Sequence, residues 1–199
     1  MLEQRIQQHF IDSADLKYQA AQTLSPAIAA AAQAMVACMT SGARVLACGT
    51  GPCGALAQQF AALCITGFER DRPELAALAI AADATWSCVS AEGGPIDARL
   101  AQQVRALGQA GDVLLMFTIT GNDPALLQAV QAAHERDMTV VACFGRDGGA
   151  LAAQLRETDV QIGVMHERAA RVREMQVLVL HCLCDSMDIL LLGDQEILL

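Results

Sequence analysis

Short, almost continuous apolar runs alternate along the chain with longer stretches in which apolar residues recur at helical spacing. Such runs are typical of parallel strands that are buried on both faces of a sheet. Five runs are interpreted as strands, at residues 45–48, 75–80, 113–119, 139–144 and 160–164. Because helix-like stretches separate them, the sequence predicts an α/β protein with a doubly wound parallel sheet and right-handed crossovers.

Helices are expected before, between and after these strands. Residues 2–23 carry apolar residues at helical spacing and predict an amphipathic helix. Ser25 as N-cap and Pro26 in the first turn predict that a separate helix follows, over residues 27–40. Further helices are predicted at residues 55–63, 95–107, 148–155 and 168–192, one opens at residues 124–130, and Asp83 is expected to cap a short one. The last helix is apolar nearly all round, so we expect copies of it in other subunits to enclose it.

Two of the predicted strands run into tight turns that are followed by a helix. The first turn, at residues 49–54, is rich in Gly and contains Pro, and the second, at residues 120–123, reads Thr-Gly-Asn-Asp. A strand, a tight turn and a helix together aim free backbone N–H groups at an anion, usually a phosphate. Turns at the carboxyl ends of parallel strands can share one crevice, which is where open α/β sheets bind ligands.

Composition and charge narrow the choice of partners. Apolar residues make up 54% of the 199 residues and charged residues only 18%, so we expect surface to be buried between subunits. The net charge of −9 argues against direct nucleic-acid binding and suits a basic protein partner. Neither a signal peptide nor a membrane span is recognised, so a cytoplasmic protein is expected. The eight cysteines are irregularly spaced without a CxxC pair, which favours reduced, packed thiols over a zinc or disulfide framework.

The two turns, the link at residues 68–73 (FERDRP) and the final helix resemble the sugar isomerase (SIS) domain. Within that family the chain resembles the phosphoheptose isomerases and their non-catalytic branch, the DnaA initiator-associating proteins. Residues 101–115, 136–142 and 170–185 look more like the initiator-associating branch. The resemblance implies a flavodoxin-like five-stranded sheet, a helical extension at residues 1–33 before an SIS domain at residues 34–199, and a homotetramer.

The resemblance also implies a phosphosugar cradle, which is degenerate here. Its expected residues are Thr50, Gly51, Cys53, Thr118, Thr120, Gly121, Asn122 and Asp123. Cys53 replaces a Ser hydroxyl, and Pro52 removes one backbone N–H from the first turn. Asp123 puts a carboxylate where a Ser would hold phosphate, and two unit charges about 4 Å apart repel by roughly 4 kcal/mol at an effective dielectric constant of 20. An ordinary helix N-cap is the favoured explanation of Asp123, and it is compatible with repulsion of a phosphate.

The positions that carry chemistry in the isomerases have changed. The family has a His and a Glu four residues apart after the first turn, where this chain has Gln59 and Leu63. It has a Gln and a His eight residues apart on the last helix, where this chain has Arg173 and His181. A single His cannot hold zinc or run a two-base proton transfer, so no catalytic residue, metal or cofactor is expected.

Other acids and histidines give weaker indications. Glu174 and Asp97 match family acids, although no partner for either is evident from the sequence. His181 is also explained as a buried histidine at a subunit interface. The remaining histidines, His9, His134 and His166, are scattered and are expected at the surface.

The first functional hypothesis is a non-catalytic tetramer that binds the initiator DnaA and promotes assembly of the initiation complex. The resemblance places the DnaA contact at Leu191 and Leu192, which could also simply pack at a subunit boundary, and residues 197–199 could extend that patch. The alternatives are a sedoheptulose 7-phosphate isomerase and a sensor that binds a phosphosugar without converting it.

Overall fold

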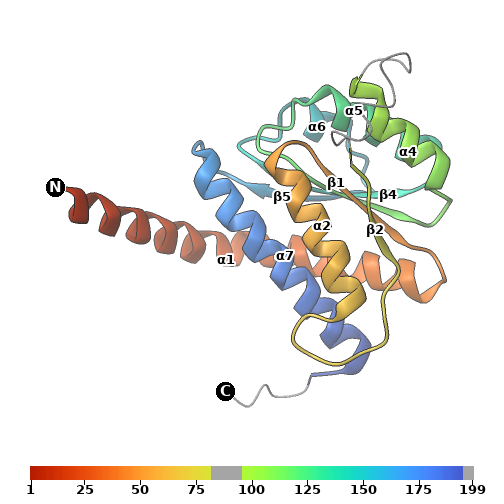
Figure 1. Cartoon of the computed structure of the whole chain (residues 1–199), viewed down its shortest axis with the longest axis horizontal. Coiled ribbons are helices and arrows are strands. Elements are labelled where there is room, and N and C mark those ends of the chain that lie inside the picture. The colour runs from red at the N-terminus through yellow and green to blue at the C-terminus, as the bar shows by residue number, and fades with distance from the viewer. Residues whose placement is uncertain (82–95, 195–199) are drawn as a thin grey trace.

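Parallel strands form the centre of the molecule (Figure 1). The structure is a computed structural model that describes residues 1–81 and 96–194. Within those residues, five strands form one sheet in the order β2-β1-β3-β4-β5. They are β1 (Val45–Gly49), β2 (Ala77–Ala79), β3 (Val113–Phe117), β4 (Thr139–Gly145) and β5 (Val160–Val164). This order is the flavodoxin-like one, and it confirms the predicted fold class.

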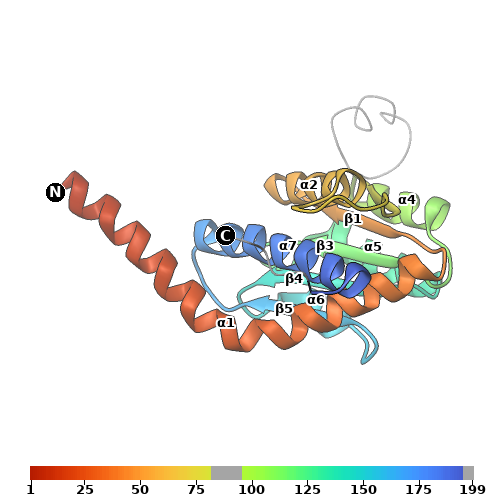
Figure 2. The same cartoon turned by 90° about the horizontal axis from the view of Figure 1, so that it is seen from below.

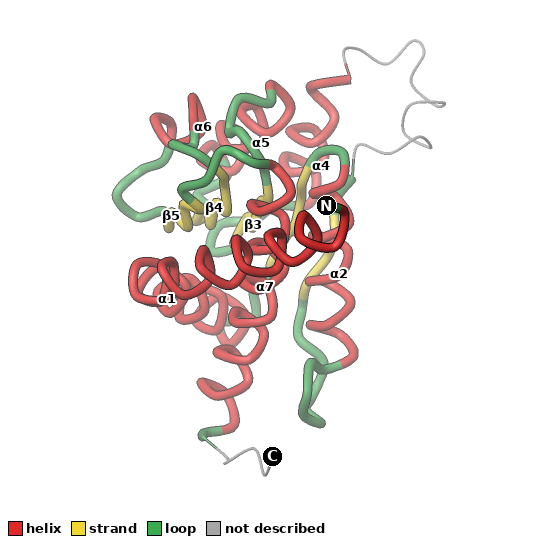
Figure 3. The backbone as a smooth tube through the Cα atoms, turned by 90° about the vertical axis from the view of Figure 1, so that its left-hand side faces the viewer, coloured by secondary structure: helices red, strands yellow, loops and turns green. Residues whose placement is uncertain are grey.

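Helices cover both faces of the sheet (Figure 3). They are α1 (Leu2–Thr40), α2 (Pro52–Thr66), α4 (Arg99–Leu107), α5 (Pro124–Glu135), α6 (Gly149–Gln154) and α7 (Ala169–Leu192), with a 3₁₀ turn η1 (Ile96–Ala98) before α4. α1, α2 and α7 form one core with alternate strand residues such as Val45 and Leu115. α4, α5 and α6 form the other core with the intervening residues, such as Leu46 and Leu114. Burial on both faces explains why β1 and β3 are apolar at almost every position.

The strand register places the two predicted turns side by side. Gly49, the last residue of β1, pairs with Phe117, the last residue of β3. Phe117 in turn pairs with Cys143 of β4. The chain therefore leaves β1 and β3 at the same level of the sheet, and the turns before α2 and α5 lie at one edge.

The predicted break between two N-terminal helices is wrong. α1 continues from Leu2 to Thr40 with Pro26 inside it. Ser25 does not cap a new helix, because its hydroxyl donates to the carbonyl of Ala21 one turn earlier. Pro26 lacks an N–H and kinks a helix rather than always ending it, and Figure 2 shows α1 changing direction part-way along. Packing on both sides of the proline, against α7 and β5, keeps the two halves helical.

The N-terminal half of α1 projects away from the sheet (Figure 2), and several of its large apolar side chains are exposed. Leu2 and Phe10 are 73% and 74% exposed, and on α7 Leu178 and Leu190 are also exposed. The homotetramer stays a prediction, and in it we expect such exposed apolar side chains to be covered.

Most other predicted elements have close counterparts. β5 has the predicted bounds, α7 begins one residue later than predicted, and β2 is shorter than predicted. The predicted cap Asp83 and the tail at residues 197–199 lie outside the described residues. α1 and α7 are long and apolar enough to cross a membrane by length and composition, but both supply residues to the core on one face of the sheet, as core helices do.

Candidate functional site

The turn after β1 is shaped by the close approach of the chain to itself. A Cβ on Gly49 would lie 2.5 Å from the carbonyl oxygen of Cys53, so only Gly fits there. Pro52 starts α2, where its missing N–H costs little. The backbone N–H of Cys53 donates to the carbonyl of Thr50 at 3.1 Å, and that of Gly54 donates to the carbonyl of Gly51 at the same distance. These two N–H groups are already used inside the turn.

A cavity of about 440 Å³ opens between the two turns, at the carboxyl ends of β1 and β3. Its lining combines backbone of the first turn with side chains from both ends of the cavity: Gly49, Thr50, Gly51, Gly54, Ala55, Gln58, Ala81, Asp97, Asp123 and Ala125. The structure thus brings Thr50, Gly51 and Asp123 of the expected cradle together. Gln58 and Ala81 also line the cavity, and the sequence did not mark either of them. Among the described lining residues none is Lys or Arg, while Asp97 and Asp123 are both acidic.

The turn after β3 uses its polar groups on itself. The Thr118 hydroxyl is buried and accepts from the N–H of Gly121 at 3.2 Å. Gly121 has φ +68°, and a Cβ there would lie 1.9 Å from the carbonyl oxygen of Gly148. The Asp123 carboxylate accepts from the N–H of Ala125 at 2.9 Å and so caps α5, while it also lines the cavity. Asp123 therefore combines the two features that the sequence suggested: it caps a helix and it borders the cavity.

Three further cradle residues lie elsewhere. Thr120 and Asn122 border a second cavity of about 760 Å³, on the other side of this turn, together with Arg146 and His166. The Asn122 side chain accepts there from the N–H of Ala150 at 2.9 Å. Cys53 is buried, and its thiol donates to the Gln176 side chain at 3.7 Å.

The residues at the positions that carry chemistry in the resemblance are not part of the lining of this cavity. Nε2 of Gln59 lies 3.4 Å from Nε2 of His181, and the His181 ring packs against Phe68 with ring centroids 5.3 Å apart. Leu63 packs against the core. An amide, an imidazole and a leucine side chain do not fit a zinc site, and we derive no metal chemistry from them.

Arg173 and Cys53 influence one another electrostatically near the first turn. Burial raises the pKa of the Cys53 thiol, and the positive charge of Arg173 partly opposes that rise. Arg173 is exposed, so it brings a cation to the neighbourhood of a turn whose cavity is otherwise acidic.

Gln176 was not predicted as part of the site, although it is fully buried and contacts both turns. Its only sequence signal is an amide inside an otherwise apolar stretch of the last helix.

The expectation that His134 lies at the surface is wrong. Its side chain is 9% exposed and lies 2.7 Å from the Asp159 carboxylate. Asp159 also accepts from the N–H groups of Val140 and Arg156, both at 2.8 Å, so this pair orders the start of β4 and the loop before β5.

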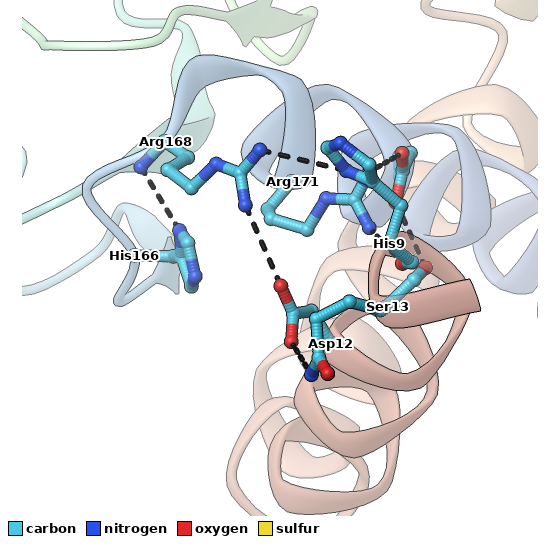
Figure 4. A network of polar contacts seen from close by, with 8 residues as sticks. His9, Asp12, Ser13, His166, Arg168 and Arg171 are labelled. Carbon is cyan, nitrogen blue, oxygen red and sulfur yellow. Dashed lines mark hydrogen bonds and ion pairs between the residues drawn. The ribbon is translucent and has the colours of Figure 1, made fainter. Parts of the chain in front are cut away.

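The other two histidines are half-buried and belong to a polar network that joins α1 to the start of α7 (Figure 4). Arg171 donates to the carbonyl of His9 at 2.6 Å, and Ser13 donates to Glu174 at 2.8 Å. His166 accepts from the N–H of Arg168 at 2.9 Å. Glu174 thus holds α1 in place and is not a solitary acid.

Comparison with known proteins identifies the family. The pattern of the SIS domain matches residues 8–145. The chain belongs to the SIS domain family. It is 54% identical over 199 residues to the phosphoheptose isomerase of Methylibium petroleiphilum, covering 99% of this chain and 98% of that protein. It is 46% identical over 195 residues to the phosphoheptose isomerase of Thiobacillus denitrificans, covering 98% and 99%.

Solved structures agree with these relatives. Phosphoheptose isomerase GmhA from Neisseria gonorrhoeae is 41% identical, with a TM-score of 0.86 over 94% of this chain and 99% of that one. A phosphoheptose isomerase from Francisella tularensis is 39% identical, with a TM-score of 0.88 over 94% and 98%.

These comparisons overturn the first functional hypothesis. Relatives that match almost the whole chain at 46% to 54% identity are named phosphoheptose isomerase, which supports an isomerase rather than a non-catalytic DnaA-binding protein. Leu191 is half-buried and Leu192 is 41% exposed at the end of α7, and no DnaA contact is assigned to them. The hypothesis weighed a few changed site residues more heavily than the likeness of the whole chain.

Proposed function

We propose that this protein interconverts the ketose and aldose forms of a phosphorylated heptose, with sedoheptulose 7-phosphate as the substrate. The observation that carries the proposal is the 54% identity, over 99% of the chain, to a protein named phosphoheptose isomerase. The cavity between the turns supports it, because it lies where open α/β sheets bind their ligands.

Ketose–aldose interconversion requires a base that moves a proton between two neighbouring carbon atoms. Asp97 is our candidate for that base, because it is an acidic residue in the lining of the cavity. Asp123 is less suited, because its carboxylate already accepts from the backbone of α5. His181, whose imidazole lies beside Gln59, is our candidate for the proton transfers on the sugar oxygens.

Phosphate binding in this cavity depends on balancing charges. The two carboxylates repel a phosphate dianion, while the exposed Arg173 near the first turn attracts it. We therefore expect the sugar phosphate to bind weakly, with its reacting carbons near Asp97.

The test is a direct assay of sedoheptulose 7-phosphate conversion, followed by NMR of the product. We expect turnover by the unaltered protein and a loss of about 100-fold or more in Asp97→Asn, the usual size of a general-base effect. His181→Ala should also reduce turnover, whereas Asp147→Asn, which lines the second cavity, should not. Turnover that is unchanged in Asp97→Asn would show that the base lies elsewhere.

A second candidate function is binding of the phosphosugar without conversion. The observation that favours it is the presence of Gln59, Leu63 and Arg173 at the positions where the resemblance implies His, Glu and Gln. Calorimetry and the NMR assay together distinguish the two functions. A protein that only binds sedoheptulose 7-phosphate gives a binding signal in calorimetry but no product in the NMR assay.

A further inference from the structure

Gln176 is a fully buried amide, and both ends of its side chain are engaged. Its Nε2 donates to the carbonyl of Thr118 at 2.7 Å and to the carbonyl of Cys143 at 3.2 Å. Its Oε1 accepts from the thiol of Cys53 at 3.7 Å. A buried amide with this many partners is held in one orientation, because turning it would leave donors and acceptors unpaired in the core.

The partners of Gln176 belong to both turns that border the cavity. Thr118 is the first residue after β3, and its hydroxyl holds the N–H of Gly121 in the second turn. Cys53 lies in the first turn of α2, and its N–H holds the carbonyl of Thr50. Cys143 lies on β4 and also accepts from the N–H of Thr118 at 3.0 Å. One side chain of α7, which runs alongside α2 (Figure 1), therefore bonds a residue of the first turn and the residue that starts the connection after β3.

We propose that Gln176 is a positioning residue that fixes the two turns relative to each other, and thereby sets the affinity of the cavity for a phosphorylated ligand. The inference about affinity rests on the proposed function, whereas the coupling of the turns does not. Gln176 does not line the cavity, so it acts through Thr118 and Cys53 rather than by contact with the ligand.

Two variants distinguish the hydrogen bond between Gln176 and the first turn from its hydrogen bonds to both turns together. Gln176→Met keeps a side chain of similar length and removes the hydrogen bonds to both turns. Cys53→Ala removes only the connection to the first turn. Val179→Ala is the matched control, because Val179 is a buried α7 residue one turn further along the same helix, and the change removes core packing without touching either turn.

Amide hydrogen exchange on the ligand-free protein tests the coupling directly. We expect Gln176→Met to speed exchange about tenfold or more at Cys53 and Gly54 of the first turn and at Thr118 and Gly121 of the second. Cys53→Ala should speed exchange only at the first turn. Val179→Ala should leave the ratio between the exchange rates of the turns and those of the core unchanged. Exchange in Gln176→Met that matches Val179→Ala would overturn the proposal. If Gln176→Met does not fold, Cys53→Ala decides the proposal. Unchanged exchange rates at the first turn in Cys53→Ala would overturn the proposal, and faster exchange at that turn alone would support it.

Kinetics and calorimetry with sedoheptulose 7-phosphate test the effect on affinity. We expect KM and Kd to rise about tenfold in Gln176→Met while kcat changes by less than about threefold, since uniform binding is lost rather than a transition-state contact. An unaltered protein that binds no sugar phosphate would refute the proposed function, while the exchange result still decides the coupling. Equal Kd values for the unaltered protein and Gln176→Met, with faster exchange at both turns, would overturn the link between turn position and affinity.

Discussion

The two turns that border the cavity follow neighbouring strands, but different parts of the molecule stabilise them. The turn after β3 is stabilised by its own residues: Thr118 binds Gly121, and Asp123 caps α5. The turn after β1 has backbone hydrogen bonds of its own, but the side chain of Cys53 bonds outside the turn, to Gln176 of α7, which also donates to the carbonyl of Thr118. The far end of α2 shows the same dependence, because Arg72 donates to the carbonyls of Leu63 and Cys64 and pairs with Asp188 of α7.

This difference indicates that the β3–α5 unit is locally determined, whereas the β1–α2 unit takes its position from the last helix. Gln176 bonds residues at both turns, so a change in α7 that spares Gln176 should disturb the first turn more than the second.

The largest effect is expected from breaking the buried pair between Arg72 and Asp188. Both side chains are 1% exposed, so Arg72→Met would leave a carboxylate buried without its cation and lower the free energy of unfolding by about 3–5 kcal/mol. The matched control is Arg105→Met, which breaks the exposed pair with Glu135 between α4 and α5 and should cost at most about 1 kcal/mol. Urea unfolding measures both, and equal losses would contradict the contrast between the units.

A methyl group added to each turn compares their internal packing. Gly121→Ala would place a Cβ against the Gly148 backbone in a left-handed conformation, and should lower the free energy of unfolding by roughly 3 kcal/mol. Gly51 has φ +54° and ψ −131°, which residues other than glycine rarely adopt, but a Cβ there meets nothing within 4 Å, so Gly51→Ala should cost only the conformational strain of about 2 kcal/mol. A larger loss for Gly51→Ala than for Gly121→Ala would show that the first turn is the tighter one.

Substitutions of Asp123 distinguish the structural role of the second turn from its role in ligand binding. Ser and Asn both cap helices, so Asp123→Ser and Asp123→Asn should change the free energy of unfolding by less than about 0.5 kcal/mol. Removing the carboxylate from the cavity should tighten binding of sedoheptulose 7-phosphate roughly tenfold in calorimetry. Asp147→Asn controls for net charge, since it lines the second cavity. Equal tightening in all three variants would mean that long-range charge, and not this site, limits affinity.

The sheet was largely predictable because it depends on local pattern. Buried parallel strands must be apolar, and the run at residues 160–164 gives β5 its observed bounds. The kinked α1 was not predictable from Ser25 and Pro26, because a helix-start signal is local whereas the packing that keeps α1 continuous involves α7 and β5.

The site was predictable only in part. Glycines and a capping Asp place the turns, so Thr50, Gly51 and Asp123 could be expected at one cavity. Gln176 could not, because its partners lie 123, 58 and 33 residues away in the chain. The changed residues Gln59 and Leu63 led to the wrong functional hypothesis, since single positions say little about what the whole chain has retained.

The smallest predicted effect is a loss of stability at alkaline pH through a buried thiol. Cysteines occur in β1 and α2 and are absent from residues 113–135. Burial, with a smaller contribution from the Asp123 carboxylate, raises the pKa of Cys48 from 9.0 to about 12. Between these values the unfolded chain has lost a proton that the folded chain keeps, so stability falls as the pH rises above 9. The Cys48 contribution should be intact at pH 7 and reduced by about 0.8 kcal/mol at pH 9.5.

Urea unfolding under reducing conditions at pH 7 and pH 9.5 measures this loss. In Cys48→Ala the drop between the two pH values should be smaller than in the unaltered protein by that amount. Met116 on β3, the register partner of Cys48, supplies the control Met116→Leu, in which the drop should be unchanged. An identical pH dependence in Cys48→Ala and the unaltered protein would show that this thiol ionises alike in both states. The lower free energy of unfolding at alkaline pH would then not come from Cys48.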